Sequence, residues 1–363
     1  MPIATNEIKQ RVLQGDTSVS PEFCRVWLQE VSRTFALNIR VLPRELEEVV
    51  RLAYLFMRIA DTVEDDRQMS PQMRQELLER FIRCFDAQGG DSDEIRGFLE
   101  GLPAQWRQDD HPDRFLVAHC QHVFAVYRGV APALRQSVDE RVKEMCGGMI
   151  HYALKRESDG WFQLGTRQEL LDYCYFVAGT VGLMLTDLFA GHDMSSKRRE
   201  KLRANAVGFG LALQLVNIAR DIPADGTRHT IFVPEDICQA RGILPRQLWE
   251  EGHRAEASQV LLDLVRLADR EVRAAQEYIL DLPWYRFRLR LFCLWPLLMS
   301  QDTLALLAKD PTAALAGRVK ITRSQVRRIL WTTTATCWSN LALRFQFGSR
   351  NNLLQKHLRE AIA

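Results

Sequence analysis

Apolar residues recur every three or four positions along most of this 363-residue chain, and that spacing is its strongest constraint on fold. In the segment after Glu45 the apolar positions are Leu46, Val49, Val50, Ala53, Phe56, Met57 and Ala60. This spacing places their side chains on one face of an α-helix. Similar stripes cover 116–127, 170–188, 204–222, 257–280 and 329–343, and no Asn-Gly turn joins alternating runs. The sequence therefore predicts an all-α fold.

The chain shows no break that would divide it into domains. It contains no low-complexity linker and no repeat of fixed period. We therefore expect a single helical domain over residues 23–345, a bundle with a central cleft. Residues 1–22 form an N-terminal segment whose order the sequence does not predict, and residues 346–363 are expected to form a helical C-terminal tail.

Composition excludes several classes of protein. The formal net charge is only +2, which gives no reason to expect a nucleic-acid partner. The eight cysteines are scattered without a Cys-x-x-Cys pair, so we expect reduced thiols in the core of a cytoplasmic protein. The longest apolar run, 291–299, is much shorter than the ~20 residues of a membrane span. We expect a monomer without a transmembrane segment that meets lipid only at the membrane periphery.

An acidic cluster ends the first apolar stripe. Asp61 and Asp65 lie four residues apart, so both carboxylates point to one helix face about 6 Å apart along the axis. Glu64 lies beside that face. Like charges at this spacing repel one another unless a cation offsets them. The cluster is therefore a candidate cation site.

A second cluster follows another apolar run. Asn217, Asp221 and Asp225 are spaced by four, which stacks one amide and two carboxylates on a helix. Mg²⁺ prefers such oxygen ligands and completes its shell with substrate phosphates. Each cluster can also be the solvated end of a helix. The apolar helices and the neighbouring Arg58 and Arg220 weigh toward a site for Mg²⁺ and a diphosphate, without excluding that alternative.

Several blocks carry a resemblance to a known family. The blocks are VSRTFALNIRVLP at 31–43, YLFMRIADTVEDD at 54–66, YCYFVAGTVGLMLTDLF at 173–189 and LQLVNIARDIPAD at 213–225. In this order they resemble the squalene/phytoene synthase family, over about residues 23–343. The segments FCLWP at 292–296 and AGRVKITRSQ at 316–325 resemble the members that also carry out an NADPH-dependent reduction to squalene.

The resemblance implies the reaction and its metal. Two farnesyl diphosphates would be condensed head to head into presqualene diphosphate, which NADPH would reduce to squalene. Mg²⁺, or Mn²⁺ in its place, would make the diphosphate a leaving group. The residues that the resemblance assigns to the metal are Asp61, Glu64, Asp65, Asp221 and Asp225.

The resemblance also implies roles for other side chains. Tyr173, Arg58 and Phe292 are expected to be catalytic. The expected substrate contacts are Ser32, Arg33, Phe35, Tyr54, Arg58, Val177, Gly182 and Asn217. No glycine-rich dinucleotide motif follows a strand, so the NADPH contacts are expected elsewhere, at Asn217, Arg220, Lys320 and Arg323.

Some positions depart from the family's pattern or stay open. Pro223 predicts a kink or helix end inside the second cluster, where Ala224 replaces a usual acidic residue. Arg290 stands at a position that is usually Phe. The small residues at 177–182 allow either close helix packing or space for a prenyl chain.

The sequence leaves two alternatives to squalene formation. A related synthase could stop at dehydrosqualene, hydroxysqualene or phytoene, against which the 316–325 block argues. A non-catalytic helical assembly factor of the same fold would be expected to have lost its aspartates, and these are present.

Overall fold

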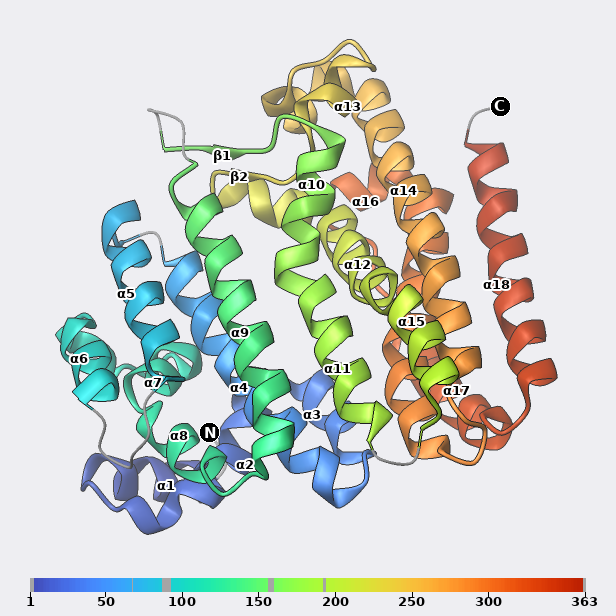
Figure 1. Cartoon of the computed structure of the whole chain (residues 1–363). Coiled ribbons are helices and arrows are strands. Elements are labelled where there is room, and N and C mark those ends of the chain that lie inside the picture. Colours follow the sequence, from blue (N-terminus) through green and yellow to red (C-terminus); the bar gives the residue numbers. More distant parts are fainter. Residues whose placement is uncertain (1–2, 67, 87–92, 156–159, 192–193, 362–363) are drawn as a thin grey trace. The chain divides into compact units, whose positions relative to one another are not determined.

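A computed structural model describes residues 3–66, 68–86, 93–155, 160–191 and 194–361 (Figure 1). These residues are almost entirely helical, with two strands of two residues each, which confirms the predicted all-α fold. The chain forms two compact units, Met1–Leu154 and Lys155–Ala363, called unit 1 and unit 2 below. All eight cysteines are buried and free, as expected for core thiols.

Unit 1 consists of short helices around two long ones. Ser32 and Ser70 accept hydrogen bonds from the first turns of α3 and α5, and a proline opens α5, α7 and α9. Its elements are α1 (Ile3–Leu13), η1 (Thr17–Val19), α2 (Ser20–Val31), α3 (Arg33–Arg40), α4 (Arg44–Asp65), α5 (Pro71–Arg83), α6 (Asp93–Gly101), η2 (Ala104–Gln108), α7 (Pro112–Ala118), α8 (Gln121–Tyr127) and α9 (Pro132–Ala153).

An aromatic cluster holds unit 1 together around α4. The Phe56 ring lies 4.6–6.3 Å from the rings of Phe81, Phe85, Phe124 and Tyr127, which come from α5, the turn after it and α8. Tilted and edge-on pairs at these distances contribute beyond the area they bury. The cluster fixes the middle of α4, the helix that carries the first acidic cluster.

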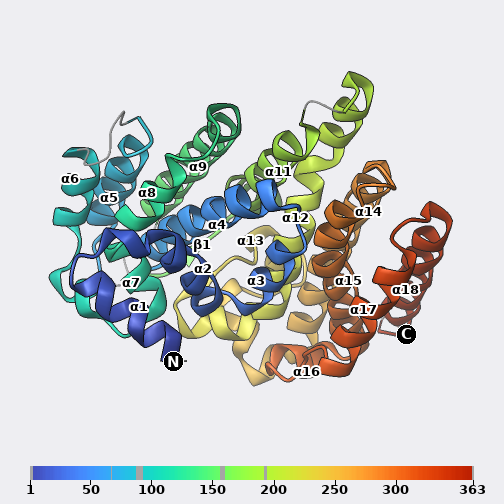
Figure 2. The same ribbon diagram turned by 90° about the horizontal axis from the view of Figure 1, so that it is seen from below.

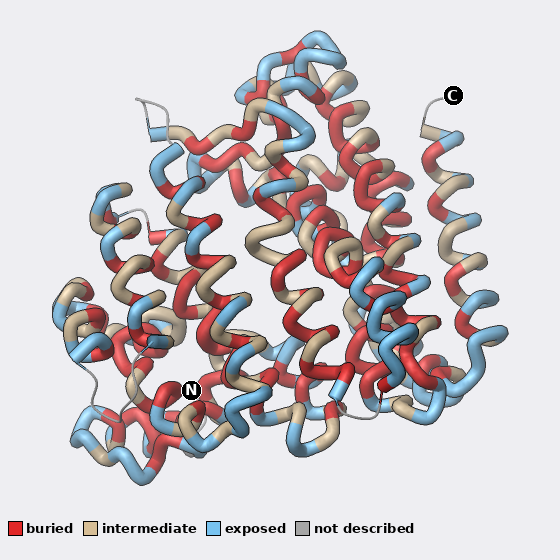
Figure 3. Tube along the Cα trace, in the orientation of Figure 1, coloured by how far each residue is buried: buried red, intermediate tan, exposed pale blue. Residues whose placement is uncertain are grey.

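Unit 2 is built on longer helices. In Figure 2, α14, α15, α17 and α18 lie side by side, and in Figure 3 buried residues run along α12, α14 and α15. Its elements are β1 (Phe162–Gln163), α10 (Arg167–Cys174), the π-helix η3 (Tyr175–Gly179), α11 (Thr180–Ala190), α12 (Ser196–Thr227), β2 (Thr230–Ile231), α13 (Glu235–Gln239), η4 (Pro245–Trp249), η5 (Glu251–His253), α14 (Arg254–Asp281), α15 (Phe287–Lys309), α16 (Pro311–Leu315), α17 (Arg323–Thr336) and α18 (Asn340–Glu360).

Helix α12 approaches the η3–α11 segment so closely that only glycine fits at two positions. A Cβ at Gly182 would lie 2.0 Å from the carbonyl oxygen of Ala206, and one at Gly210 would lie 2.1 Å from that of Ala178. Of the two alternatives for the small residues at 177–182, close helix packing therefore applies at Gly182. Residues Tyr175–Gly179 form a π-helix, an irregularity often found at functional sites.

Three helical segments of unit 2 have the length and composition of membrane spans. They are Arg167–Ala190, Ser196–Thr227 and Phe287–Lys309, and the described structure buries 61%, 61% and 72% of their most apolar stretches. A search for uninterrupted apolar runs does not detect these segments, because scattered polar residues interrupt the apolar sequence of each helix. Length and composition alone do not distinguish a span from a core helix, so the absence of a transmembrane segment stays a prediction.

The close approach at Gly210 predicts a stability difference between two glycine substitutions. Gly210→Ala should lower the free energy of unfolding by about 3 kcal/mol, because the new methyl group meets backbone atoms that cannot move aside. Gly147→Ala in α9, where a Cβ would meet nothing within 4 Å, should be neutral or raise it by up to about 1 kcal/mol. Urea denaturation followed by circular dichroism measures both. Equal stability of the two variants would contradict the close approach.

Candidate active-site residues

A polar stripe runs along the otherwise buried helix α4. Tyr54, Arg58, Asp61 and Asp65 follow one another at steps of four, three and four residues, so they lie on one face. They are partly or fully exposed, whereas the apolar residues between them are buried. This arrangement differs from a solvated helix end, because the charged groups continue a stripe that starts in the middle of the helix.

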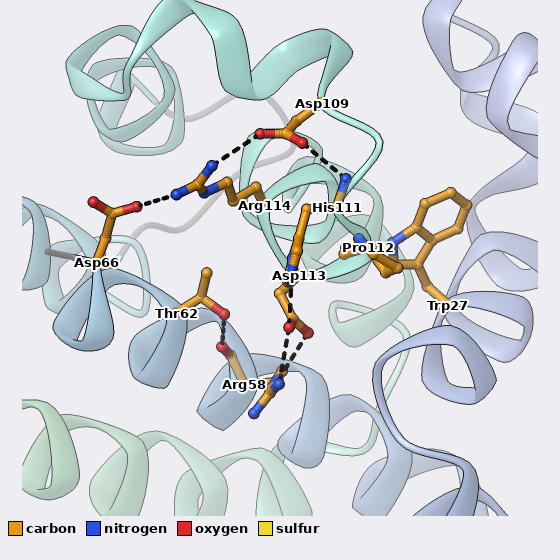
Figure 4. Close-up of polar contacts among 9 residues, drawn as sticks. All are labelled: Trp27, Arg58, Thr62, Asp66, Asp109, His111, Pro112, Asp113 and Arg114. Atoms are coloured by element: carbon orange, nitrogen blue, oxygen red, sulfur yellow. Dashed lines mark hydrogen bonds and ion pairs between the residues drawn. The ribbon is translucent and has the colours of Figure 1, made fainter. Parts of the chain in front are cut away.

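Arg58 is held in place by a residue that the sequence analysis missed. Its Nε and Nη2 donate to Oδ1 and Oδ2 of Asp113, both at 2.9 Å (Figure 4). Burial opposes the charged form of Arg58, but the hydrogen bond and charge of Asp113 raise the pKa of Arg58 overall. Nη1 donates to no described residue. A two-pronged ion pair of this kind fixes the guanidinium plane and leaves one nitrogen for a ligand.

The segment before α7 positions Asp113. Pro112 opens the helix, and its carbonyl oxygen accepts a hydrogen bond from Trp27 Nε1 at 2.8 Å (Figure 4). Asp113 therefore lies in the first turn, where a carboxylate is favoured by the helix dipole. The Pro-Asp pair at a helix start was the available sequence signal, but nothing in the spacing linked it to Arg58.

Asp66 serves the structure of unit 1 instead of the acidic face. It is buried and pairs at 3.0 Å with Arg114, whose other nitrogen pairs with Asp109 at 3.3 Å (Figure 4). Asp109 also accepts a hydrogen bond from the backbone of His111 at 2.8 Å. The chain thus treats adjacent carboxylates differently, because Asp66 is neutralised by arginine whereas Asp65 forms no ion pair with a described residue.

Asp61 and Asp65 form no ion pair with any described side chain. The pKa of Asp61 is raised to about 7, mainly by burial; Arg58 lowers it, and the charges of Asp65 and Asp113 add to the rise. A carboxylate in this setting gains from a bound cation. Glu64 follows on the same turn, and its carbonyl oxygen accepts a hydrogen bond from the buried Arg74 at 2.8 Å. The first cluster therefore fits a hard divalent cation.

Predicted substrate contacts gather at the corner between α2 and α3. Ser32 caps α3 by accepting a hydrogen bond from the backbone of Phe35 at 3.3 Å. Burial raises the pKa of the Tyr54 hydroxyl, and the nearby Ser32 side chain opposes that rise. The rings of Phe35 and Tyr54 lie 5.2 Å apart. Arg33 is exposed at the start of α3. Unit 1 thus brings Ser32, Phe35 and Tyr54 together on the helix that also carries Arg58.

The second cluster is divided between two environments. Asn217 is exposed, Asp221 is half-buried and Asp225 is buried, which differs from the expectation of a single shared face. Four residues turn an α-helix about 40° past a full circle, so the third member is rotated about 80° from the first. Asp221 pairs with Arg220 at 2.5–2.7 Å, and Asp225 pairs with Arg228. A metal at these carboxylates would have to share them with two arginines.

Pro223 does not end its helix. Helix α12 continues for one more turn to Thr227, and the carbonyl oxygen of Ile222 accepts a hydrogen bond from Trp249 Nε1 at 3.2 Å. The Trp249 ring lies directly over Gly226, where a Cβ would come within 2.4 Å of it. Of the two outcomes expected at Pro223, a helix end is therefore excluded.

The 316–325 block meets the second cluster within unit 2. A Cβ at Gly317 would lie 3.9 Å from Cβ of Pro223, so the loop after α16 runs beside the last turns of α12. Lys320 and Arg323 are exposed and form no ion pair with a described residue. Both side chains are therefore available to an anionic ligand.

Tyr173 and Phe292 occupy different parts of unit 2. Tyr173 is buried at the end of α10, with the Phe232 ring 4.9 Å away. Phe292 packs edge-on at 5.9 Å against Phe189, which lies sixteen residues beyond Tyr173 on the same run of helix. Sixteen residues span about 24 Å of helix, so Tyr173 and Phe189 lie near opposite ends of this run.

Arg290, at the position where Phe is usual, has a structural role. It is almost fully buried without a carboxylate partner, and burial lowers its pKa. Its nitrogens donate to the carbonyl oxygens of Leu282 at 2.5–3.0 Å, Leu280 at 3.3 Å and Cys337 at 3.0 Å. These carbonyls end α14 and α17, where the helix dipoles favour a cation.

Within the described part of each unit, no three His, Cys, Asp or Glu side chains converge as a complete metal site. The structure therefore supplies partial ligand sets, one on α4 and one on α12. An ion that keeps waters and substrate phosphates in its shell, as Mg²⁺ does, suits partial sets better than Zn²⁺.

Comparison with known proteins gives a consistent result. A family model described as squalene/phytoene synthase matches residues 28–325. The squalene synthase of Schizosaccharomyces pombe is 29% identical over 307 residues, which are 85% of this chain and 64% of that protein. That of Solanum lycopersicum is 26% identical over 340 residues, 89% of this chain and 74% of that protein. The chain thus spans less than two thirds of the length of the S. pombe relative.

Solved structures share the fold. The complex of TcSQS with the ligand E5700 has a TM-score of 0.75 at 25% identity and covers 94% of this chain and 98% of that one. A dehydrosqualene synthase with a bound ligand has a TM-score of 0.53 at 19% identity and covers 90% and 98%. Both agree with the predicted all-α isoprenoid-synthase-type fold.

The environment of Arg290 predicts a large loss of stability on its removal. Arg290→Met should lower the free energy of unfolding by about 3 kcal/mol, because it leaves buried carbonyls without donors. Arg241→Met removes an exposed pair with Asp263 and should cost less than about 1 kcal/mol. Guanidinium denaturation of both variants makes the comparison. A cost at Arg290 no larger than that at Arg241 would refute the capping role.

Proposed function

Because the chain belongs to the squalene/phytoene synthase family, as its sequence blocks predicted, we propose that it is a squalene synthase. It would join two farnesyl diphosphates head to head into presqualene diphosphate and reduce this product to squalene with NADPH. The names of its relatives in S. pombe and S. lycopersicum support this proposal. The block at 316–325 favours it over synthases that stop before the reduction.

One observation carries the proposal: α4 presents an arginine and two carboxylates without cationic partners on one face. Arg58, fixed by Asp113, can bind a phosphate oxygen through its remaining nitrogen. Asp61 and Asp65, with Glu64 beside them, would hold Mg²⁺ on unit 1, and Asp221 and Asp225 would do so on unit 2. When bound, the metal would neutralise the diphosphate and make it a better leaving group.

The remaining side chains would orient the substrate and keep it dry. Phe35 and Tyr54 offer aromatic faces next to Arg58, and such faces stabilise positive charge on a prenyl chain. Val177 is half-exposed on the π-helix, whereas Gly182 contributes by letting α12 approach. The buried Phe292 and Phe189 form a water-free surface for the apolar product.

The proton and hydride steps of the proposed reaction involve two further sets of residues. Tyr173 is the residue we assign to the polar step of cyclopropane formation, with Phe232 and Phe162 holding its ring. Lys320 and Arg323, with Asn217 and Arg220, would bind the phosphates of NADPH, which supplies the hydride when bound. The exposure of Lys320 and Arg323 is compatible with this role.

The acidic face predicts the effect of neutralising it. Asp61→Asn/Asp65→Asn should reduce turnover of farnesyl diphosphate by about a thousandfold or more, since several kcal/mol of charge stabilisation is lost. The measurement is product formation from purified protein, farnesyl diphosphate and Mg²⁺, with and without NADPH. The wild type should give squalene only with NADPH and presqualene diphosphate without it.

The control for this prediction lies on the same helix. Glu45→Gln/Glu48→Gln neutralises two exposed carboxylates at the other end of α4 and should leave turnover within about twofold. Turnover that survives in the Asp61/Asp65 variant would end the metal assignment. A wild-type product that is dehydrosqualene, hydroxysqualene or phytoene would place the chain with a different synthase of the family.

The ion pair of Arg58 predicts a coupled effect at Asp113. Asp113→Asn should raise KM for farnesyl diphosphate about tenfold, because the guanidinium is no longer fixed, and should add nothing in an Arg58→Gln background. Asp109→Asn loosens Arg114 in the same corner and should leave KM unchanged. Steady-state kinetics of the double-mutant cycle measure the coupling. Additive effects of Asp113 and Arg58 would show that Asp113 does not act through Arg58.

A further inference from the structure

One end of unit 2 brings together segments that are far apart in the sequence. The loop between α14 and α15 and the turn between α17 and α18 are linked by Arg290, which bonds the carbonyl oxygens of Leu282 and Cys337. Asn340 Nδ2 also donates to the carbonyl oxygen of Leu280 at 3.3 Å. Figures 1 and 2 show α17 and the start of α18 beside α15 at this end.

This end exposes large apolar side chains. Trp284 is 62% exposed, Leu341 81% and Phe345 78%. Tyr285 and Trp338 are also exposed, and the Trp338 ring packs at 4.6 Å against Phe287. We call these five exposed residues, Trp284, Tyr285, Trp338, Leu341 and Phe345, the aromatic end. A cluster of this size on a soluble surface marks a contact with another phase or molecule.

Cations border the aromatic end. The first two turns of α12 carry Lys197, Arg198, Arg199 and Lys201, all exposed, and a single acid, Glu200. Arg198 and Lys201 act electrostatically on Asp281, the last residue of α14, which places the start of α12 at the same end of the unit. The first turn of α12 contains no acid. Cations at a helix N-terminus oppose the dipole, so they reduce stability here unless an anion meets them.

We propose that the aromatic end docks onto the anionic surface of a lipid bilayer. Trp and Tyr rings favour the membrane–water interface, since one part of each ring is apolar and another donates hydrogen bonds. Each Lys or Arg near an anionic lipid surface strengthens the binding. A second copy of the chain is a poorer occupant, because it would bring the same cations together. The proposal does not depend on the proposed reaction.

Vesicle co-sedimentation tests the proposal on the full chain. Wild-type protein should sediment with vesicles of phosphatidylcholine containing about one third phosphatidylglycerol, and about tenfold less with phosphatidylcholine alone. Binding should weaken as salt is raised, because exposed charges are screened. No sedimentation with the anionic vesicles at low salt would overturn the proposal.

Substitutions separate the apolar and the charged contributions. Two variants should each weaken binding to the anionic vesicles about tenfold or more. The first is the triple variant Trp284→Gln/Leu341→Gln/Phe345→Gln, and the second is the double variant Lys197→Gln/Lys201→Gln. The matched controls are Leu244→Gln/Leu353→Gln, which removes exposed leucines elsewhere on unit 2, and Arg254→Gln/Lys309→Gln, at the opposite helix ends. The controls should bind like the wild type. Equal losses in controls and test variants would overturn the proposal.

Light scattering without vesicles distinguishes the other occupant. The wild type should show no association that the Trp284/Leu341/Phe345 variant abolishes. If that variant converts a wild-type dimer into a monomer, the aromatic end is an interface between copies and the proposal is wrong. Denaturation midpoints of all four variants near that of the wild type show that lost binding does not reflect unfolding.

Discussion

The cost of placing charge on buried helices constrains this structure more than any other factor. Helices α4 and α12 are buried along most of their length, yet each carries carboxylates of the acidic clusters. A desolvated carboxylate must be paired, protonated or bound to a cation. The chain pairs Asp66 with Arg114, Asp221 with Arg220 and Asp225 with Arg228, and it leaves Asp61 and Asp65 without such a partner. That difference favours the α4 face as the place where an external cation would bind, as we propose above.

Three arginines show how the same side chain serves two purposes. Arg74 is buried and donates to the carbonyl oxygens of Glu64 and Ala153, so it joins the ends of α4 and α9. Arg290 does the same for the ends of α14 and α17. Arg58 is bound on two nitrogens by Asp113 and keeps its third for a ligand. Carbonyl acceptors at helix ends therefore explain the structural roles of Arg74 and Arg290, whereas Arg58 has a carboxylate partner and keeps a nitrogen for the ligand that we propose.

The sequence predicted what depends on helical periodicity and missed what depends on contacts between elements. The all-α fold and the acidic residues on one face of α4 follow from local spacing. The family blocks named Ser32, Phe35 and Tyr54 as substrate contacts but did not predict that these residues lie at one corner. Asp113 was missed because it reaches Arg58 from fifty-five residues away. The rotation of Asp225 away from Asn217 was missed because residues four apart were assumed to lie on one helix face. Each step of four residues turns the side chain about 40° past a full circle. Arg290 could not be interpreted without the carbonyls that surround it.

The same reasoning explains why the aromatic end differs from the rest of unit 2. In the described part of this unit, side chains cap α10, α16, α17 and α18, whereas α11, α13, α14 and α15 have no side-chain cap. The start of α12 also has no side-chain cap, and it gathers cations in the least favourable place for them. These cations gain no stability from the helix dipole. The cations and the exposed rings beside them are consistent with a partner that supplies both negative charge and an apolar layer, and a lipid surface supplies both.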